Sequence, residues 1–305
     1  MKTDTTLWGT IIQATSGYFT VQTADGQVVA RLRGKLKQKW AGGDIAALGD
    51  RVRVLLLTDG SGAIEEVAPR THALIRTAPS ARGEFQQVLL ANPDQVVFVF
   101  AVAHPDPHLR MLDRFLVIAE QQGIPPLIIA NKLDLTNNKQ AEELFSLYPP
   151  LGYPVIYTSV KTGEGIEEMR AALTGKLSAF AGPSGVGKTS LLNAIQPELG
   201  LAVREISEAT DKGRHTTVAR RMFPLDGGGY VADLPGMRML ALWDIQPEEL
   251  DGYFPELRNL VRDCQYNDCT HSDEPGCAVL KAVAEGRVHP LRHDSYLRLR
   301  FGEPD

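Results

Sequence analysis

The chain has 305 residues, enough for two or three domains, and its 43% apolar and 23% charged residues are ordinary for a globular protein. No stretch approaches the ~18 consecutive apolar residues of a membrane-spanning helix, and the first residues lack a secretory-signal pattern, so we expect a cytoplasmic protein with no membrane partner. The net charge of −5 argues against a protein that coats nucleic acid over its whole surface. No interface signal stands out, so a monomer is expected.

Residues 1–72 predict a small β-barrel. Five short segments of strand-like composition, separated by turn residues, are residues 9–13, 18–22, 28–33, 51–57 and 63–67. Five short strands in this length suit a closed barrel of the oligonucleotide-binding (OB) type.

A basic segment in this region is the candidate RNA-binding surface. Five basic residues without an acidic neighbour are Arg31, Arg33, Lys35, Lys37 and Lys39. If the segment is extended, alternation places all five side chains on one face. Such a face would suit RNA phosphates, and the alternative is a solvated strand edge that basic residues protect from pairing.

The pattern of the chain changes after residues 71–90, which have the composition of a linker. Apolar runs then alternate with helical segments such as residues 109–122, and these runs are residues 96–102, 127–130, 155–157, 177–181 and 230–233. This alternation predicts a parallel α/β sheet, which we assign to residues 73–242. Residues 243–305 predict a small, mainly helical domain that is held together by a metal ion.

A phosphate-binding loop follows the run at residues 177–181 and begins a helix. Its residues match G-x-x-x-x-G-K-[ST] and are Gly182, Pro183, Ser184, Gly185, Val186, Gly187, Lys188 and Thr189, with Ser190 next in the helix. Backbone N–H groups of such a loop wrap the β-phosphate where the helix dipole favours negative charge. Lys188 would reach the β- and γ-phosphates, and the Thr189 hydroxyl would hold Mg²⁺.

Two further loops favour GTP and GDP over ATP. Asn131, Lys132 and Asp134 form an N-K-x-D sequence after a predicted strand, and a carboxylate at Asp134 would accept two hydrogen bonds from guanine. Adenine lacks that donor pair, so an unpaired carboxylate would reject it. Asn131 and Lys132 would brace this loop. A second loop would approach the base through backbone N–H groups, and it contains Ser159, Val160 and Lys161.

Two downstream segments have the composition of nucleotide-sensing switches. Asp233 would hold Mg²⁺ through water, and the Gly236 N–H would sense the γ-phosphate. The polar stretch at residues 213–217 offers a threonine for Mg²⁺, and Thr217 is the better candidate because it lies next to a predicted strand.

The three cysteines lie between residues 264 and 277 and share that segment with a histidine. The four candidate ligands are Cys264, Cys269, His271 and Cys277. Three thiolates and one imidazole fill a tetrahedral Zn²⁺ shell and leave no open position, which predicts one structural zinc ion. Iron–sulfur or redox use is the alternative. Other histidines, His293 among them, and the tail arginines, Arg292 among them, are expected on the surface.

The order of the motifs is permuted: the base-reading loops precede the phosphate loop, which precedes both switch segments. With the flanking barrel and metal segment, this order resembles the RsgA (YjeQ/YloQ) family of small-ribosomal-subunit biogenesis GTPases. Long segments carry the resemblance, which spans nearly the whole chain, and they are residues 112–135, 182–190, 212–217, 233–236 and 264–277. The resemblance implies an OB-fold barrel, a circularly permuted Ras-like P-loop GTPase and a helical zinc-binding domain.

The resemblance also implies a GTP hydrolase that the small (30S) ribosomal subunit stimulates late in subunit maturation. Its partners would be the subunit, its 16S rRNA and other assembly factors. Met237 stands where a Ras-like enzyme carries the glutamine that orients water, so unstimulated hydrolysis should be slow. In the family a histidine of the first switch is implicated, and His215 matches it, although His215 would otherwise be an exposed residue that contacts RNA or solvent. The predicted catalytic set is Lys188, His215, Thr217 and Gly236.

Two other functions remain open on the sequence alone. One is a guanine-nucleotide-dependent binding switch with negligible turnover, which Met237 suits equally well. The other is a P-loop kinase of a small metabolite, which the N-K-x-D sequence and the lack of an evident acceptor pocket disfavour.

Overall fold

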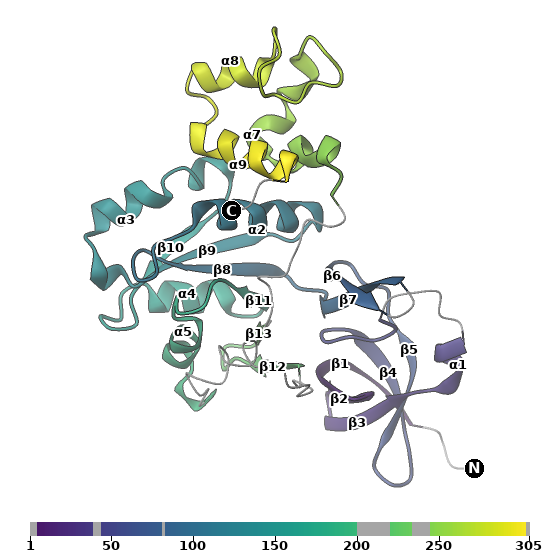
Figure 1. The fold of residues 1–305 in the computed structure, drawn as a ribbon. Helices are drawn as coiled ribbons and strands as arrows, with labels where there is room; N and C mark the ends of the chain where they lie inside the picture. The colour runs from purple at the N-terminus through teal and green to yellow at the C-terminus, as the bar shows by residue number, and fades with distance from the viewer. Residues whose placement is uncertain (1–4, 39–43, 81–82, 200–219, 234–244, 303–305) are drawn as a thin grey trace.

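The structure, a computed structural model, describes residues 5–38, 44–80, 83–199, 220–233 and 245–302 (Figure 1). Within these residues a barrel, an α/β sheet and a helical C-terminal region follow one another along the chain. This order and these classes confirm the predicted fold class. No helix among the described residues has both the length and the apolar character to cross a membrane.

The N-terminal strands close into a five-stranded barrel. Its strands are β1 (Thr6–Thr15), β2 (Tyr18–Thr23), β3 (Gly26–Leu32), β4 (Arg51–Leu56) and β5 (Gly62–Val67). They pair in the order β1-β2-β3-β5-β4, and β4 returns to β1 to complete the ring. Ile11, Val21 and Ile64 are fully buried inside it, because alternate side chains of each strand point inward. The predicted OB-type barrel is therefore confirmed.

The basic segment does not stay extended, which corrects the prediction of one five-residue charged face. Strand β3 ends at Leu32, and helix α1 (Gly34–Gln38) follows. Lys, Leu and Gln favour helix, and Leu36 packs against the barrel core. Residues two positions apart in a helix differ by about 200°, so the alternation on which the predicted face depended is lost. Lys39 lies outside the described residues.

The expected linker at residues 71–90 is instead a β-hairpin. Strands β6 (Ala73–Ser80) and β7 (Gly83–Ala91) pair antiparallel, with a bulge between Leu74 and Ile75. The proline, glycine and polar residues of this segment and its weak periodicity favoured a linker, but a two-stranded ribbon has a free edge on each side, where a proline costs no ladder hydrogen bond.

A six-stranded sheet forms the centre of the molecule. Its strands are β8 (Gln95–Ala101), β9 (Pro126–Asn131), β10 (Val155–Thr158), β11 (Leu177–Ala181), β12 (Arg220–Pro224) and β13 (Tyr230–Asp233). The order is β10-β9-β8-β11-β13-β12, and all neighbours are parallel except β12 and β13. The carboxyl ends of the parallel strands therefore share one edge, where ligands bind in open α/β sheets.

Helices cover both faces of this sheet (Figure 1). On one face α2 (Leu109–Gln121) and α3 (Asn138–Phe145) pack with Phe98 and Phe100, whereas α4 (Ile166–Leu173) and α5 (Lys188–Ile195) pack on the other with Val97 and Val99. Successive residues of β8 thus point to opposite layers, and its uniform burial explains its unbroken apolar sequence. Short 3₁₀ turns complete this part, namely η1 (Leu133–Leu135), η2 (Pro149–Leu151) and η3 (Pro197–Leu199).

The C-terminal region is mainly helical and rests on α2 (Figure 1). Its elements are η5 (Pro247–Tyr253), α7 (Pro255–Arg258), η6 (Val261–Asp263), α8 (Ala278–Ala284) and α9 (Pro290–Phe301). Helix α9 contacts both α2 and η5. Val117 of α2 belongs to the same buried cluster as Leu250, Phe254 and Tyr296, so this region shares its core with the α/β layer.

Within the described residues, strand β1 of the barrel pairs with β12 of the central sheet. Gln13 and Ala14 of β1 pair antiparallel with Arg221 and Arg220 of β12, the edge strand of the sheet.

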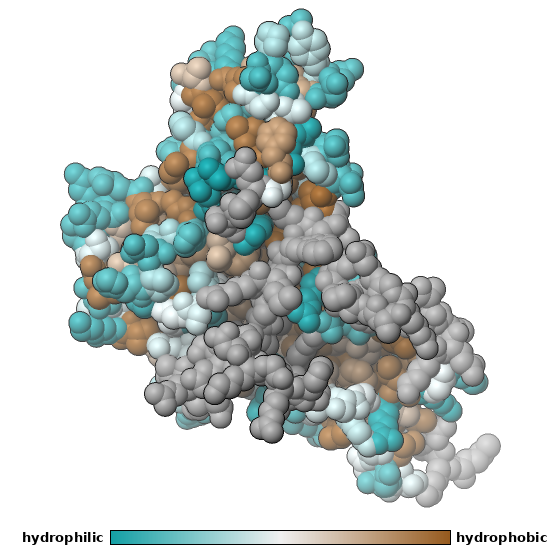
Figure 2. Space-filling view, in the orientation of Figure 1, coloured by the Kyte–Doolittle hydropathy of each residue, from teal (hydrophilic) through white to brown (hydrophobic). Residues whose placement is uncertain are grey.

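On the face of the molecule in Figure 2, hydrophilic residues gather on the outer side of α3 and at the far end of the C-terminal region, with hydrophobic residues between them.

Candidate guanine-nucleotide site and metal centre

The phosphate loop lies between β11 and α5, as its sequence requires. Gly182 has φ +149°, and a Cβ there would lie 2.1 Å from the Val99 carbonyl oxygen. Gly187 has φ +96°, and its Cβ would lie 2.5 Å from Asn131 Nδ2. A Cβ at Gly182 would therefore collide with β8, and one at Gly187 with Asn131 at the end of β9, so the glycines let the loop sit directly above these strands.

Lys188 and Thr189 occupy the first turn of α5. Lys188 Nζ donates hydrogen bonds to the carbonyls of Gly182 (2.9 Å) and Pro183 (2.8 Å), so its ammonium group lies across the loop. Thr189 is 8% exposed. A cation and a helix N-terminus at one loop give a positive electrostatic environment that suits phosphate.

Asn131 connects the base-reading loop to the phosphate loop. Its Nδ2 donates to the Val186 carbonyl (2.8 Å), and its Oδ1 accepts from Thr158 Oγ1 (3.1 Å). Asn131, Thr158 and Val186 are buried. The amide therefore fixes three loops from β9, β10 and β11 relative to one another.

Asp134 and Ser159 face each other across the two candidate base-binding loops. Ser159 Oγ donates to Asp134 Oδ1 (2.7 Å), and Lys161 Nζ lies 3.7 Å from Asp134 Oδ2. The Ser159 hydrogen bond, with smaller contributions from the Asp134 backbone N–H and from Lys161, holds the pKa of Asp134 below its ordinary value. The carboxylate is therefore ionised at neutral pH and keeps the acceptor capacity that guanine requires. Val160 is exposed.

Lys132 has a left-handed backbone (φ +66°), and its ammonium group donates to the carbonyl of His104 in the loop after β8. This contact braces a fourth loop at the same edge, and sequence reasoning did not find it because residues 104 and 132 belong to different strand–helix units.

The predicted switch residues lie mostly outside the described part of the chain. His215, Thr217 and Gly236 fall there, as does the whole of residues 207–217. The backbone of Asp233 ends β13 opposite Phe180 of β11, one strand away from the phosphate loop.

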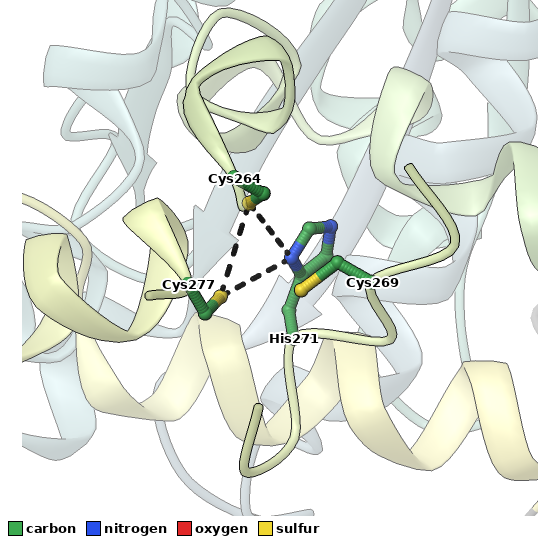
Figure 3. Close-up of side chains that lie close together, drawn as sticks. All are labelled: Cys264, Cys269, His271 and Cys277. Carbon is green, nitrogen blue, oxygen red and sulfur yellow. Dashed lines mark hydrogen bonds between the residues drawn. The ribbon is translucent and has the colours of Figure 1, made fainter. Parts of the chain in front are cut away.

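The four predicted metal ligands converge in the C-terminal region (Figure 3). Their ligand atoms all lie within 4.8 Å of one another, with His271 Nδ1 3.6 Å from Cys264 Sγ and 3.4 Å from Cys277 Sγ. Zn–S bonds of about 2.3 Å and Zn–N bonds of about 2.0 Å place tetrahedral ligands about 3.5–3.8 Å apart. The residues present therefore fit a tetrahedral zinc ion.

The protonation of these thiols depends on their burial. Burial raises the pKa of Cys269 to about 12 and also raises the pKa of Cys277. Without a metal both are therefore neutral thiols at pH 7, and a metal ion would bind them by displacing protons. The Leu280 N–H donates to Cys277 Sγ (3.4 Å), which would stabilise a thiolate there.

A buried ionic cluster between α9, α7 and α2 was missed and corrects two expectations. Arg292 was expected on the surface but is 1% exposed, and it donates to Asp113 (2.7 Å) and Glu256 (2.6 Å). His293 is also buried, and its Nε2 lies 2.8 Å from the His271 carbonyl oxygen. Asp113 and Arg292 lie 179 positions apart, so no local pattern could have paired them.

The barrel retains part of the predicted basic surface. Arg31, Arg33 and Lys35 are exposed, and Arg33 forms an ion pair with Glu65. The guanidinium of Arg31 lies 3.9 Å from the centre of the Tyr18 ring, and Tyr18 is 44% exposed. Sequence reasoning missed this aromatic partner, which follows from the cross-strand pairing of Tyr18 and Arg31.

The strands that carry the base-reading loops precede the strand that carries the phosphate loop, yet all of them share one parallel sheet. The molecule is therefore a circularly permuted P-loop GTPase. Residues 67–243 match the RsgA GTPase family, and residues 8–64 match the RsgA N-terminal domain. The chain belongs to the RsgA family and is a GTP hydrolase.

Individual relatives match over nearly the full chain. The small ribosomal subunit biogenesis GTPase RsgA of Gemmatimonas aurantiaca is 46% identical over 98% of both chains, and that of Caldanaerobacter subterraneus subsp. tengcongensis is 40% identical over 95% of this chain and 94% of its own. The crystal structure of YjeQ from Thermotoga maritima superposes with a TM-score of 0.81 at 36% identity, covering 98% of this chain and 99% of its own. YloQ, a circularly permuted GTPase, gives 0.74 at 31% identity, with 98% and 95% covered.

Proposed function

We propose that this GTPase binds the small (30S) ribosomal subunit late in its maturation and hydrolyses GTP to GDP and phosphate when the subunit stimulates it. The observation that carries this proposal is the end-to-end match to relatives named for small-subunit biogenesis, which includes the barrel and the metal-binding segment as well as the GTPase sheet. The protein would be a cytoplasmic monomer that contacts 16S rRNA. Other assembly factors would be further partners on the subunit.

Different loops at the carboxyl edge of the sheet would bind different parts of the nucleotide. Lys188 would neutralise the β- and γ-phosphates, and Asp134 would read guanine. Thr189 and Thr217 would hold Mg²⁺, with Asp233 acting through water, and the Gly236 N–H would sense the γ-phosphate. The remaining loop residues would contribute backbone N–H groups and shape, and they are Lys132, Ser159, Val160, Lys161, Pro183, Ser184, Gly185 and Ser190. The contacts of Asn131 and Lys188 support this division because they already hold the loops together.

His215 would orient the attacking water, because Met237 has no polar group for that role. A neutral imidazole serves this purpose at neutral pH, since its ordinary pKa is near 6.5. Placement of His215 would depend on the subunit, which would account for the proposed stimulation.

Three units would divide the work, with boundaries at residues 1–72, 73–242 and 243–305. The barrel would contact RNA through Arg31, Arg33 and Lys35 beside Tyr18, and Lys37 and Lys39 extend the same segment. The C-terminal unit would hold one structural zinc ion through Cys264, Cys269, His271 and Cys277. Because four protein ligands complete the shell, the ion would supply folding energy rather than catalysis.

The test is GTP turnover by the pure protein with and without purified small subunits, with large subunits and ATP as controls. A large rise with GTP and small subunits alone is the expected result. His215→Ala should keep nucleotide affinity and lose the stimulated rate, and normal stimulated hydrolysis by this variant would disprove the catalytic assignment. GTP binding without stimulated turnover would favour a binding switch instead.

A further inference from the structure

His271 is held in a backbone conformation that few residues adopt. Its φ is +61°, in the left-handed region, and the residue is fully buried. A non-glycine residue stays in this region only when its surroundings determine its position. Two contacts do so here: the His293 ring lies against the His271 carbonyl oxygen, and the Tyr296 ring lies 5.7 Å from the imidazole.

The two ring nitrogens of His271 face different partners. Nδ1 points to the sulfurs of Cys264 and Cys277, whereas Nε2 lies 3.3 Å from Oδ2 of Asp251. A neutral imidazole that offers Nδ1 to a metal keeps its proton on Nε2, and that N–H then donates to the carboxylate.

Asp251 is placed by the helix that carries it. It lies in η5 between Leu250 and Phe254, which are 2% and 0% exposed and pack in the same cluster as Cys269 and Cys277. The Phe254 ring makes an edge contact with Tyr296, which also contacts His271. The Asp251 side chain is 16% exposed, so solvent reaches it little and its position follows from the buried residues beside it.

We propose that Asp251 is the positioning residue of the metal centre: its carboxylate fixes the tautomer and ring orientation of His271, so that Nδ1 is presented to zinc. This inference rests on the proposed zinc site and adds a fifth residue to it. Outer carboxylates of this kind strengthen metal binding about 10–100-fold. The predicted switch segment that contains Gly236 precedes η5 in the sequence. The same hydrogen bond therefore connects the metal centre to the element that follows this segment.

The experiment measures zinc affinity of the full chain by competition with a chromogenic chelator, after removal of bound metal and refolding checks by circular dichroism. Asp251→Ala should raise the zinc dissociation constant about 10–100-fold. Asp251→Asn, whose Oδ1 still accepts the hydrogen bond, should lose less, and it also serves if Asp251→Ala does not fold. With Co²⁺ in place of zinc, Asp251→Ala should change the visible spectrum because the imidazole orientation changes.

Two controls separate positioning from other roles. Glu249→Gln removes an exposed carboxylate from the same helix and should leave zinc affinity unchanged, and an equal loss would show a general charge effect. In a His271→Cys background Asp251→Ala should have no effect, because the imidazole is gone, and an equal loss there would assign Asp251 to folding of η5. Either result, or wild-type affinity in Asp251→Ala, overturns the proposal. Failure of the wild-type chain to bind zinc would instead overturn the proposed metal site.

Discussion

The nucleotide loops and the contact between α9 and α2 both join residues that are far apart in the sequence, but by different interactions. Asn131 bridges three loops through neutral hydrogen bonds, whereas Arg292 pairs with two carboxylates whose side chains are at most 5% exposed. A neutral hydrogen bond contributes about 1 kcal/mol and can be exchanged for a ligand, but an unpaired buried charge is far more costly. The hydrogen bonds between the nucleotide loops can therefore rearrange when a nucleotide binds. The buried ion pairs instead hold α9 on α2 permanently.

The largest effect should follow from breaking the buried ionic cluster. Arg292→Met leaves Asp113 and Glu256 buried without a cation and should lower the free energy of unfolding by about 3–5 kcal/mol. Arg298→Met is the matched control, because Arg298 lies on the same helix, is one-third exposed and pairs with Asp294. That variant should cost less than about 1 kcal/mol. Denaturant unfolding measures both, and equal losses would show that burial of the ions does not hold α9.

The reverse pattern is expected at the phosphate loop, where function should change more than stability. Lys188→Ala removes the cation that crosses the loop and should lower GTP turnover about 10²–10³-fold. Its unfolding free energy should fall by about 1–2 kcal/mol, since the hydrogen bonds to the Gly182 and Pro183 carbonyls are lost but water reaches this half-buried position. Lys139→Ala, on an exposed face of α3, should change neither quantity. A large stability loss in Lys188→Ala would remove the contrast between the two regions.

The parts of the molecule that sequence predicted correctly are those whose determinants are local. The phosphate loop needs glycines at fixed offsets because a Cβ at Gly182 would strike β8 and one at Gly187 would strike Asn131 at the end of β9. The cysteine and histidine ligands lie within one short segment and converge as their spacing predicted. The apolar run at residues 96–102 likewise predicted a buried strand, and β8 is buried between the two helical layers.

The errors concern features whose determinants are distant or weak. Nothing near Arg292 indicates that it is buried, because its partner Asp113 lies in a helix 179 positions earlier. The hairpin β6–β7 was missed because its sequence has little periodicity and contains proline, glycine and polar residues. The basic segment was expected to be extended, but helix propensity and the packing of Leu36 bend it into α1. The base-reading and switch roles remain predictions.

Zinc binding should depend on pH because buried thiols must lose protons. Burial holds the pKa of Cys269 at about 12 and raises that of Cys277, so both stay protonated near pH 7 in the metal-free site. Zinc binding should therefore release about two protons from these two thiols, and the affinity should rise at least about 100-fold per pH unit between pH 6 and 8. Calorimetry in buffers of different ionisation enthalpy counts the protons. Release of none would show that the site binds zinc without its thiolates.

The smallest effects are expected on the barrel. Its basic side chains are exposed, so they can exchange contacts with solvent for contacts with RNA phosphates. Lys35→Ala should weaken small-subunit binding. It should also reduce the slope of log binding constant against log salt concentration by about one, because one phosphate contact is lost. Arg33→Ala should change the slope less, since Glu65 already pairs with Arg33. Tyr18→Ala should weaken binding about tenfold at every salt concentration, because stacking of a base on the ring releases no counterions from the RNA.

These three variants also test whether the barrel binds RNA by charge alone. If Tyr18→Ala changes the salt slope as Lys35→Ala does, the ring acts only by holding Arg31 in place, since their centres are 3.9 Å apart. If Tyr18→Ala lowers affinity without changing the slope, the ring contacts a base directly. Titrations of labelled protein with small subunits at several salt concentrations separate the two cases. Because all three side chains are exposed, unfolding free energies should stay within about 0.5 kcal/mol of the wild type, so a loss of binding would report the contact itself.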